Sequence, residues 1–344
     1  MQSVSAVLYA KNDLRLENRN VEQPEKDEVL VKMHSCGICG TDIAFWTLGG
    51  TGTKELEDPI ILGHESSGTI EAVGPGVIDL APGDRVAVEL GLPCRKCKLC
   101  KKGSYNLCAE RGYCWGGLTK LTRHPADFCH KLPDSVSFEQ GAMMEPLAVT
   151  VRACKRAGVS VGDNVLITGA GSIGLITIAV AKALGASRIC ITDISKRRLQ
   201  LAKEMGADFT VLAKVDETGQ VLADKVIEAM GQQADIAIEC SGVEPSYQLA
   251  VWATTSGGVV VVVALEPNMV SIPLVDAASR QVDIRGSFSY ANDYPDALAL
   301  LASGRVNIDP IITHRFSFDD TLKAFDCARD RNTGAVKVMI KIQE

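Results

Sequence analysis

The sequence is poor in aromatic residues, has no excess of basic residues and contains no long apolar run. Aromatic residues make up 5% of the 344 residues, too few for the stacking platforms that hold unpaired bases. With 36 basic against 42 acidic residues, the net charge of −6 offers no broad cationic face for a phosphate backbone. The longest aliphatic run, Val259 to Leu265, is far shorter than the ~18 apolar residues of a membrane helix. We therefore expect neither a nucleic-acid partner nor a membrane span.

The start of the chain also lacks a targeting pattern. Residues Met1 to Ala6 show neither a basic stretch followed by an apolar core nor an Arg-rich transit pattern, so we expect a cytoplasmic protein. The 12 cysteines are then expected to be thiols, some of them metal ligands, rather than disulfides. The length of 344 residues exceeds the ~250–300 residues at which one hydrophobic core stops growing, which predicts two domains.

Two kinds of pattern divide the chain. From Met1 to about Leu90, short β-branched stretches alternate with Gly, Pro and Asp turns, which predicts a barrel-like β domain. From about Gly162, near-continuous apolar strands at 164–168, 188–192, 235–239 and 258–263 are separated by helical stretches such as Lys196 to Met205. Such strands are buried on both faces, so this part predicts an α/β fold with a parallel sheet. A last strand at 335–340 is expected to complete the first domain.

A glycine-rich loop follows the first of the apolar strands. Gly169, Gly171 and Gly174 lie between that strand and a predicted helix, and Asp193 ends the next strand. This is the context of the dinucleotide fingerprint, in which the glycines allow a tight turn and close approach to a pyrophosphate, and the acid binds the adenosine ribose. Asp193 favours NAD over NADP. The basic residues 196–198 just beyond it leave NADP as the alternative.

Four cysteines lie close together at positions 94, 97, 100 and 108. Their spacing is typical of a tetrahedral zinc site, and a closed set of four thiolates indicates a structural rather than a catalytic metal. An iron–sulfur cluster or a redox relay is the alternative.

A second group of metal-ligand types remains: Cys36, Cys39, His64, Glu65 and Glu145. Taken singly, each is ambiguous, because a lone His or Glu in a globular chain is more often structural. Three mixed ligands with one exchangeable position are nevertheless what a catalytic zinc requires.

The order of these motifs resembles one family. The segments 37–42, 63–68, 83–88, 127–133 and 141–147, the four-cysteine lobe and the loop 169–174 follow one another as in the zinc-dependent medium-chain dehydrogenases. Further segments at 282–285, 292–295, 302–304 and 313–316 resemble the sorbitol (polyol, L-iditol) dehydrogenases, in the form that keeps a structural zinc. The resemblance spans essentially the whole chain.

The resemblance implies a fold, an activity and a set of site residues. The fold would be a GroES-like, barrel-type catalytic domain in two pieces, 1–148 (with the lobe 94–108) and 286–344, around a Rossmann doubly wound sheet at 149–285. The activity would be NAD-dependent interconversion of a secondary alcohol and its ketone, by a homotetramer or homodimer. Implied catalytic zinc residues are Cys39, His64, Glu65 and Glu145, with Thr41 as the proton carrier; implied cofactor contacts are Gly169, Gly171, Ile173, Gly174, Asp193, Arg198, Leu265, Phe288 and Tyr290; implied substrate contacts are Phe45, Glu145, Ser289 and Tyr290.

Several positions depart from the family pattern. Ala44 replaces a histidine of the proton route, so ordered water is the expected substitute. Phe45 replaces a tyrosine, Ser289 replaces an arginine, and the loop after Cys114 (Trp115 to Gly117) is shortened. Because these changes fall on one pocket, sorbitol is expected to be at best a weak substrate. The alternatives are a less polar secondary alcohol, or a catalytically inactive NAD-binding structural or regulatory protein.

Overall fold

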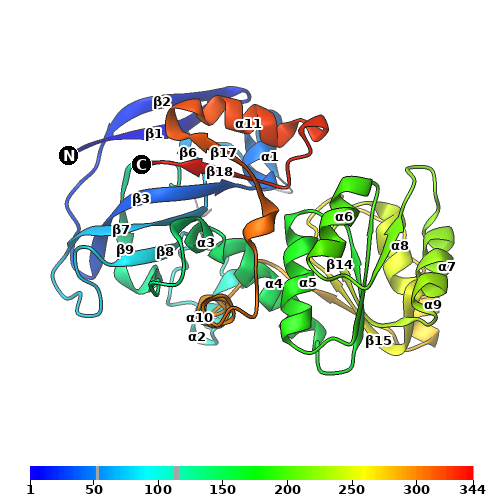
Figure 1. Ribbon diagram of the computed structural model, residues 1–344. Helices are drawn as coiled ribbons and strands as arrows, with labels where there is room; N and C mark the ends of the chain where they lie inside the picture. Colours follow the sequence, from blue (N-terminus) through cyan, green and yellow to red (C-terminus); the bar gives the residue numbers. More distant parts are fainter. Residues whose placement is uncertain (52–53, 112–115, 344) are drawn as a thin grey trace. The chain divides into compact units, whose positions relative to one another are not determined.

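Figure 1 shows the computed structural model, which describes residues 1–51, 54–111 and 116–343. The chain forms two compact units: the first comprises Met1–Glu145, Tyr294–Ala302 and Ile312–Glu344, and the second comprises Pro146–Asp293 and Ser303–Ile311. The predicted domain boundaries after residues 148 and 285 stay predictions. No helix among the described residues is long and apolar enough to cross a membrane.

The first unit is built on β-sheets. Strand β3 (Glu28–Ile38) is its central strand, and the side chains of Leu30, Val31 and Met33 are fully buried. A three-stranded sheet has the order β2-β1-β6, and a seven-stranded sheet has the order β10-β8-β7-β3-β18-β17, with β9 also paired to β3. The other strands are β1 (Gln2–Ala10), β2 (Asp13–Asn20), β4 (Gly50–Thr51), β5 (Lys54–Glu55), β6 (Ile60–Ile61), β7 (Glu65–Val73), β8 (Arg85–Glu89), β9 (Leu121–Pro125), β10 (Cys129–Lys131), β17 (Ile312–Ser317) and β18 (Lys337–Lys341).

The seven-stranded sheet of this unit is open rather than a closed barrel, because its outer strands β10 and β17 do not pair with each other among the described residues. The predicted C-terminal strand is confirmed: β18, red in Figure 1, pairs antiparallel with the blue strand β3. The helices that begin in this unit are α1 (Gly40–Leu48), α2 (Lys98–Lys101), α3 (Phe138–Ala142), α4 (Met144–Ala157), α10 (Tyr294–Ala302) and α11 (Thr321–Arg329), with short 3₁₀ turns at Tyr105–Leu107, Ala126–Phe128, Phe318–Asp320 and Arg331–Thr333.

The second unit contains the predicted parallel sheet. Its six strands have the order β13-β12-β11-β14-β15-β16, and every pair is parallel. The strands are β11 (Asn164–Thr168), β12 (Arg188–Asp193), β13 (Phe209–Leu212), β14 (Ala234–Glu239), β15 (Thr254–Val262) and β16 (Asp283–Gly286); the helices are α5 (Ser172–Ala183), α6 (Lys196–Glu204), α7 (Gly219–Met230), α8 (Glu244–Ala253) and α9 (Leu274–Ser279), with a 3₁₀ turn at Asp309–Ile311. The strand order reverses beside β11, and at such a switch point doubly wound sheets bind ligands outside the carboxyl ends of the strands.

Candidate functional site

The glycine-rich loop lies at the carboxyl end of β11, where the strand order reverses. Gly169 has a φ of +87° and lies against Ser241, and a side chain at Gly174 would collide with the carbonyl oxygen of Gly169. Both glycines are therefore required by the fold itself. Gly171 differs, because a Cβ there would meet no protein atom within 4 Å. The open space over Gly171 fits the close approach of a pyrophosphate to the backbone.

Asp193 lies at the end of β12 and is bonded to this loop. Its Oδ2 accepts a hydrogen bond of 2.7 Å from the N–H of Ala170, and its Oδ1 accepts one of 2.8 Å from the N–H of Ser195. These bonds hold the carboxylate beside the glycine-rich loop, where a ribose hydroxyl can still donate to its free lone pairs. The basic residues 196–198 form the first turn of α6, whose N-cap is Ser195.

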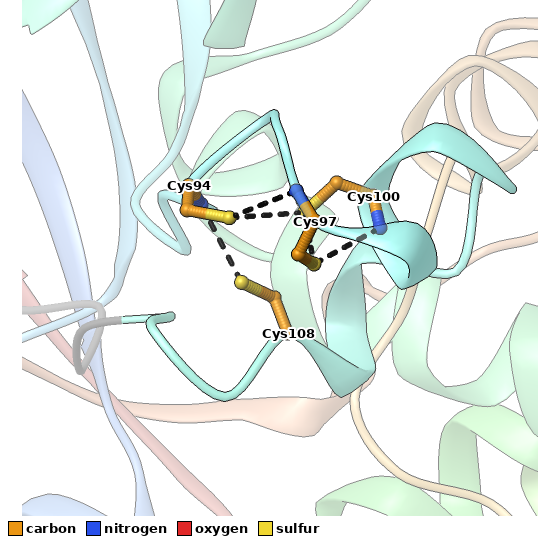
Figure 2. Close-up of side chains that lie close together, drawn as sticks. All are labelled: Cys94, Cys97, Cys100 and Cys108. Carbon is orange, nitrogen blue, oxygen red and sulfur yellow. Dashed lines mark hydrogen bonds between the residues drawn. The ribbon is translucent and has the colours of Figure 1, made fainter.

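The four predicted lobe cysteines come together around α2 (Figure 2). Their sulfur atoms all lie within 4.8 Å of one another. Backbone N–H groups point at three of the sulfurs: Cys97 N donates to Cys94 Sγ and Cys100 N to Cys97 Sγ, each at 3.4 Å, and Cys94 N donates to Cys108 Sγ at 3.5 Å. N–H donors of this kind stabilise thiolate charge. The set offers four converging soft ligands and therefore fits a tetrahedral zinc.

The lobe is attached to the sheet through a buried carboxylate. Glu89, the last residue of β8, accepts a hydrogen bond of 2.6 Å from the hydroxyl of Tyr105 within the lobe. Its other oxygen lies 2.9 Å from Nε2 of His130 on β10. Glu89 stands opposite Glu65 in the pairing of β7 and β8. The lobe is thus bonded to β8, and β8 pairs with β7, the strand that carries Glu65.

The second cluster consists of Cys39, His64 and Glu65, whose ligand atoms also lie within 4.8 Å of one another. Cys39 is the N-cap of α1, and Glu65 begins β7, which pairs with β3 so that Glu65 faces Gly37. A side chain at Gly37 would collide with the carboxylate of Glu65. The glycine that precedes the cysteine ligand therefore makes room for the carboxylate.

Asp42 orients this cluster, although no sequence pattern distinguished it as a site residue. It is fully buried, its Oδ2 accepts the N–H of Cys39 at 2.9 Å, and its Oδ1 accepts the N–H of Gly63 at 3.0 Å. Oδ1 also lies 3.5 Å from Nδ1 of His64. A carboxylate on one ring nitrogen leaves the other for a metal. Burial lowers the pKa of His64, but the charges of Asp42 and Cys39 outweigh it and raise that pKa well above its ordinary value.

Lys337 is the second residue that sequence reasoning missed. Its Nζ lies 2.6 Å from both carboxylate oxygens of Glu65 and donates to the carbonyl of Ile38 at 3.1 Å. Glu65 is 1% exposed and Lys337 3% exposed, so this is a buried ion pair. Burial lowers the pKa of Lys337, but the charge of Glu65 offsets this and raises the pKa above its ordinary value. Lys337 comes from β18, and no local motif linked it to Glu65.

Glu145 lies in the first turn of α4 and is not one of the three residues whose ligand atoms converge. Burial raises the pKa of Glu145 to about 7, although the positive charge of His64 opposes this rise. A proton donor or acceptor near neutral pH thus accompanies the cluster.

The remaining predicted residues divide between the units. In the first unit, Thr41 is half-buried on α1, and Phe45 on the same helix is 1% exposed within the hydrophobic core. In the second unit, Ile173 and Arg198 are half-buried, Leu265 is 55% and Phe288 45% exposed, Ser289 is half-buried and Tyr290 is fully buried. Trp115 and Cys114, to which the prediction of a shortened loop refers, lie outside the described residues.

Comparisons with known proteins match both units. Residues 25–134 match the family described as alcohol dehydrogenase GroES-like domain, and residues 172–303 match the family described as zinc-binding dehydrogenase. The chain is 48% identical over 345 residues to sorbitol dehydrogenase from Gallus gallus, covering 99% of this chain and 96% of that protein. It is 46% identical over 344 residues to the human (Homo sapiens) sorbitol dehydrogenase, covering 98% and 96%.

Solved structures show the same fold over the full length. L-idonate 5-dehydrogenase from Escherichia coli has a TM-score of 0.90 at 28% identity and covers 99% of each chain. An Escherichia coli oxidoreductase of unknown specificity has a TM-score of 0.92 at 32% identity and covers 100% of each chain.

Proposed function

The chain belongs to the zinc-binding alcohol dehydrogenases with a GroES-like domain and is an oxidoreductase that acts on alcohols with a nicotinamide cofactor, and we propose that its substrate is a secondary alcohol of the polyol type. The observation that carries the zinc-dependent alcohol chemistry is the convergence of Cys39, His64 and Glu65 within 4.8 Å. This mixed set of soft, borderline and hard ligands suits a zinc with one open position. Two of the dehydrogenases similar to the chain are named for sorbitol and L-idonate, both of which are polyhydroxylated.

Each residue of the site has a proposed task. Cys39, His64 and Glu65 hold the zinc, with Glu145 as an additional or exchanging carboxylate, and Cys94, Cys97, Cys100 and Cys108 hold the structural zinc. When bound, the catalytic zinc supplies a Lewis acid that polarises the alcohol oxygen, and NAD accepts the hydride. Asp42, which faces Nδ1 of His64, fixes the tautomer of that imidazole, and Lys337 holds the carboxylate of Glu65 in place.

The alcohol proton leaves through the chain's own groups and water. Thr41, two residues after Cys39, is the proposed first carrier, since a hydroxyl both accepts and donates a proton. Ala44 has no group to continue this route, so we propose that ordered water carries the proton onward.

The cofactor site is proposed on the second unit. Gly169, Gly171 and Gly174 receive the pyrophosphate at the start of α5, and Asp193 receives the adenosine ribose. Ile173, Arg198, Leu265, Phe288 and Tyr290 are the further proposed contacts. The carboxylate of Asp193 would repel a 2′-phosphate, which favours NAD over NADP.

The substrate pocket is proposed to differ from that of an ordinary polyol dehydrogenase. Phe45 lacks the hydroxyl that a tyrosine would supply, and Ser289 supplies one hydroxyl where an arginine would supply five donors. Pockets that hydrogen-bond several hydroxyls discriminate strongly for them, because each unpaired buried polar group costs ~1–3 kcal/mol. We therefore propose that sorbitol itself is at best a weak substrate, and the alternative to a polyol is a less polar secondary alcohol or its ketone.

The decisive experiment follows NADH absorbance with sorbitol, xylitol, 2,3-butanediol and a monohydric secondary alcohol, before and after a chelator, with zinc measured per chain. Turnover that the chelator removes supports the proposal, and the order of the substrates defines the class. Zinc-free protein with no turnover would instead support an inactive NAD-binding protein. Phe45→Tyr combined with Ser289→Arg is expected to raise kcat/KM for sorbitol by roughly one to three orders of magnitude. Unchanged sorbitol activity in the double variant would place the specificity elsewhere.

Assembly and location complete the proposal. We propose a homodimer or homotetramer that associates through the second unit, because β16 has one strand partner among the described residues and Ile284 on it is 38% exposed. We also propose a cytoplasmic location, supported by the free thiols of the eleven cysteines that the structure describes. Light scattering of the purified protein tests the assembly.

A further inference from the structure

The segment that joins β16 to α10 has an unfavourable backbone. It carries Phe288, Ser289 and Tyr290, which the proposed function places at the cofactor and the substrate. Ser289 has a φ of +51° and Asn292 a φ of +59°. This left-handed region is costly for serine, though less so for asparagine, and a serine persists there only where the surrounding structure holds it. Specific contacts must therefore hold the segment.

A buried carboxylate at the end of the segment supplies one contact. Asp293 is 1% exposed, and its Oδ1 accepts a hydrogen bond of 2.7 Å from Nζ of Lys155. Its Oδ2 accepts the N–H of Ala291 at 3.0 Å and lies 3.9 Å from Nη1 of Arg152. Arg152 and Lys155 are three residues apart on α4, so both project from the same face of that helix.

The start of the segment is held by the same helix. Nε of Arg156 donates to the carbonyl of Gly286 at 3.1 Å, and Nη1 of Arg285 donates to the carbonyl of Arg156 at 3.0 Å. The last turns of α4 therefore hold both ends of residues 286–293. Of these contacts, only the one to Asp293 joins a buried charge to two cations.

We propose that Asp293 is a positioning residue, whose ion pair with Lys155 and Arg152 fixes the conformation of Ser289 and Tyr290, two of the proposed substrate contacts. The inference rests on the proposed function of those two residues. Asp293 does not act on the substrate itself. It keeps the left-handed residues of the segment in one conformation, so that the alcohol does not have to order them when it binds.

A purely stabilising role makes a different prediction. An ion pair that only supports the fold would change the melting temperature and leave the Michaelis constants as they are. A positioning ion pair changes KM for the alcohol more than kcat, and it changes the affinity for NADH less, since most of the proposed cofactor contacts lie outside the segment.

The test is Asp293→Asn, which keeps the size and an acceptor for Ala291 but removes the charge. KM for the best alcohol substrate should rise about tenfold, equivalent to ~1.4 kcal/mol, while kcat changes less than about threefold and NADH affinity is kept. Lys155→Arg should retain the wild-type KM, whereas Lys155→Met should raise it. The double variant Lys155→Met with Asp293→Asn should be no worse than the worse single variant, because both remove the same interaction.

Asp320→Asn is the matched control. Asp320 pairs with Lys323 at the same 2.7 Å, but the pair is exposed and lies at the start of α11. This variant should change neither KM nor kcat. If Asp293→Asn fails to fold, Lys155→Met decides the question, since the Lys155 side chain is 43% exposed.

Two failures are distinguishable. Wild-type protein that turns over no alcohol refutes the proposed function and with it the basis of this inference. Wild-type protein that turns over an alcohol, with Asp293→Asn and Lys155→Met lowering only the melting temperature, refutes the positioning role alone. Hydrogen exchange of residues 287–292 adds a readout independent of turnover: it should be faster in Asp293→Asn than in wild type, and equal exchange would also overturn the inference.

Discussion

Replacing Lys337 by Met removes one partner of a buried ion pair at the proposed catalytic metal. Nζ of Lys337 contacts both carboxylate oxygens of Glu65 at 2.6 Å, and both side chains are nearly inaccessible. Methionine has similar length and no charge, so the change leaves the Glu65 carboxylate buried without its counter-charge. Water cannot take over that role at 1% exposure. The metal-free protein should therefore be strongly destabilised.

The size of the effect follows from the loss of one member of a buried pair, which costs ~3–5 kcal/mol. For a unit of this size, the melting temperature of metal-free protein should fall by about 6–20 °C. Bound zinc should offset this loss of stability, because the cation supplies the missing positive charge to Glu65. Adding zinc should therefore raise the melting temperature of Lys337→Met more than that of wild type.

Thermal unfolding of chelator-treated protein, followed by graded addition of zinc, measures both effects. Lys341→Met is the matched control on the same strand, because Lys341 is 54% exposed and lies 3.9 Å from Glu139. An exposed pair of this kind contributes at most ~1 kcal/mol. The reasoning is refuted if metal-free Lys337→Met has the same melting temperature as Lys341→Met, or if zinc raises its melting temperature no more than that of wild type. Either result would show that Lys337 does not neutralise Glu65.

Three further predictions concern the structural metal, the cofactor and acid stability. Cys97→Ser should release one zinc and lower the melting temperature, whereas Cys39→Ser should abolish turnover with little loss of fold. Elemental analysis and unfolding curves of both variants test this prediction. It would be contradicted if both variants simply unfolded. Asp193→Ala should raise activity with NADP relative to NAD, because the repulsion of the 2′-phosphate is removed; wild-type preference for NADP would overturn the assignment. His124 is buried with Nε2 3.0 Å from the carbonyl oxygen of Glu89, and burial lowers its pKa from 6.5 to about 4. Between these pH values His124 binds a proton in the unfolded chain but not in the folded one. The free energy of unfolding of the wild type should therefore fall by roughly 3 kcal/mol from this residue as the pH falls from 6.5 to 4. Denaturant titrations of His124→Asn should lack this contribution.

Features carried by neighbouring residues could be predicted from the sequence. The alternation of apolar strands and helices after Gly162 indicated a parallel sheet because strands buried on both faces need apolar residues throughout, and β11, β12 and β14 confirm it. The dinucleotide loop was recognisable because its glycines, strand and helix are continuous in the chain. The four lobe cysteines were recognisable for the same reason, since the ligands of the lobe lie within one short segment.

The second cluster was only partly predictable. Cys39, His64 and Glu65 had to be named as candidates from residue type and family resemblance, because each is ambiguous alone. Their convergence depends on the antiparallel pairing of β3 with β7, which places Glu65 opposite Gly37.

Sequence alone therefore determined the fold class, the dinucleotide loop and the cysteine lobe, whose defining residues are local and of distinctive type. Tertiary structure alone decided the partners of the buried charges: Lys337 for Glu65, and Lys155 with Arg152 for Asp293. Lysine, arginine and acidic residues occur throughout the chain, mostly on the surface, and no spacing distinguishes the few that are buried. A buried charge needs a partner in three dimensions, and the pairing of β18 with β3 and the packing of α4 against residues 286–293 bring those partners from distant positions.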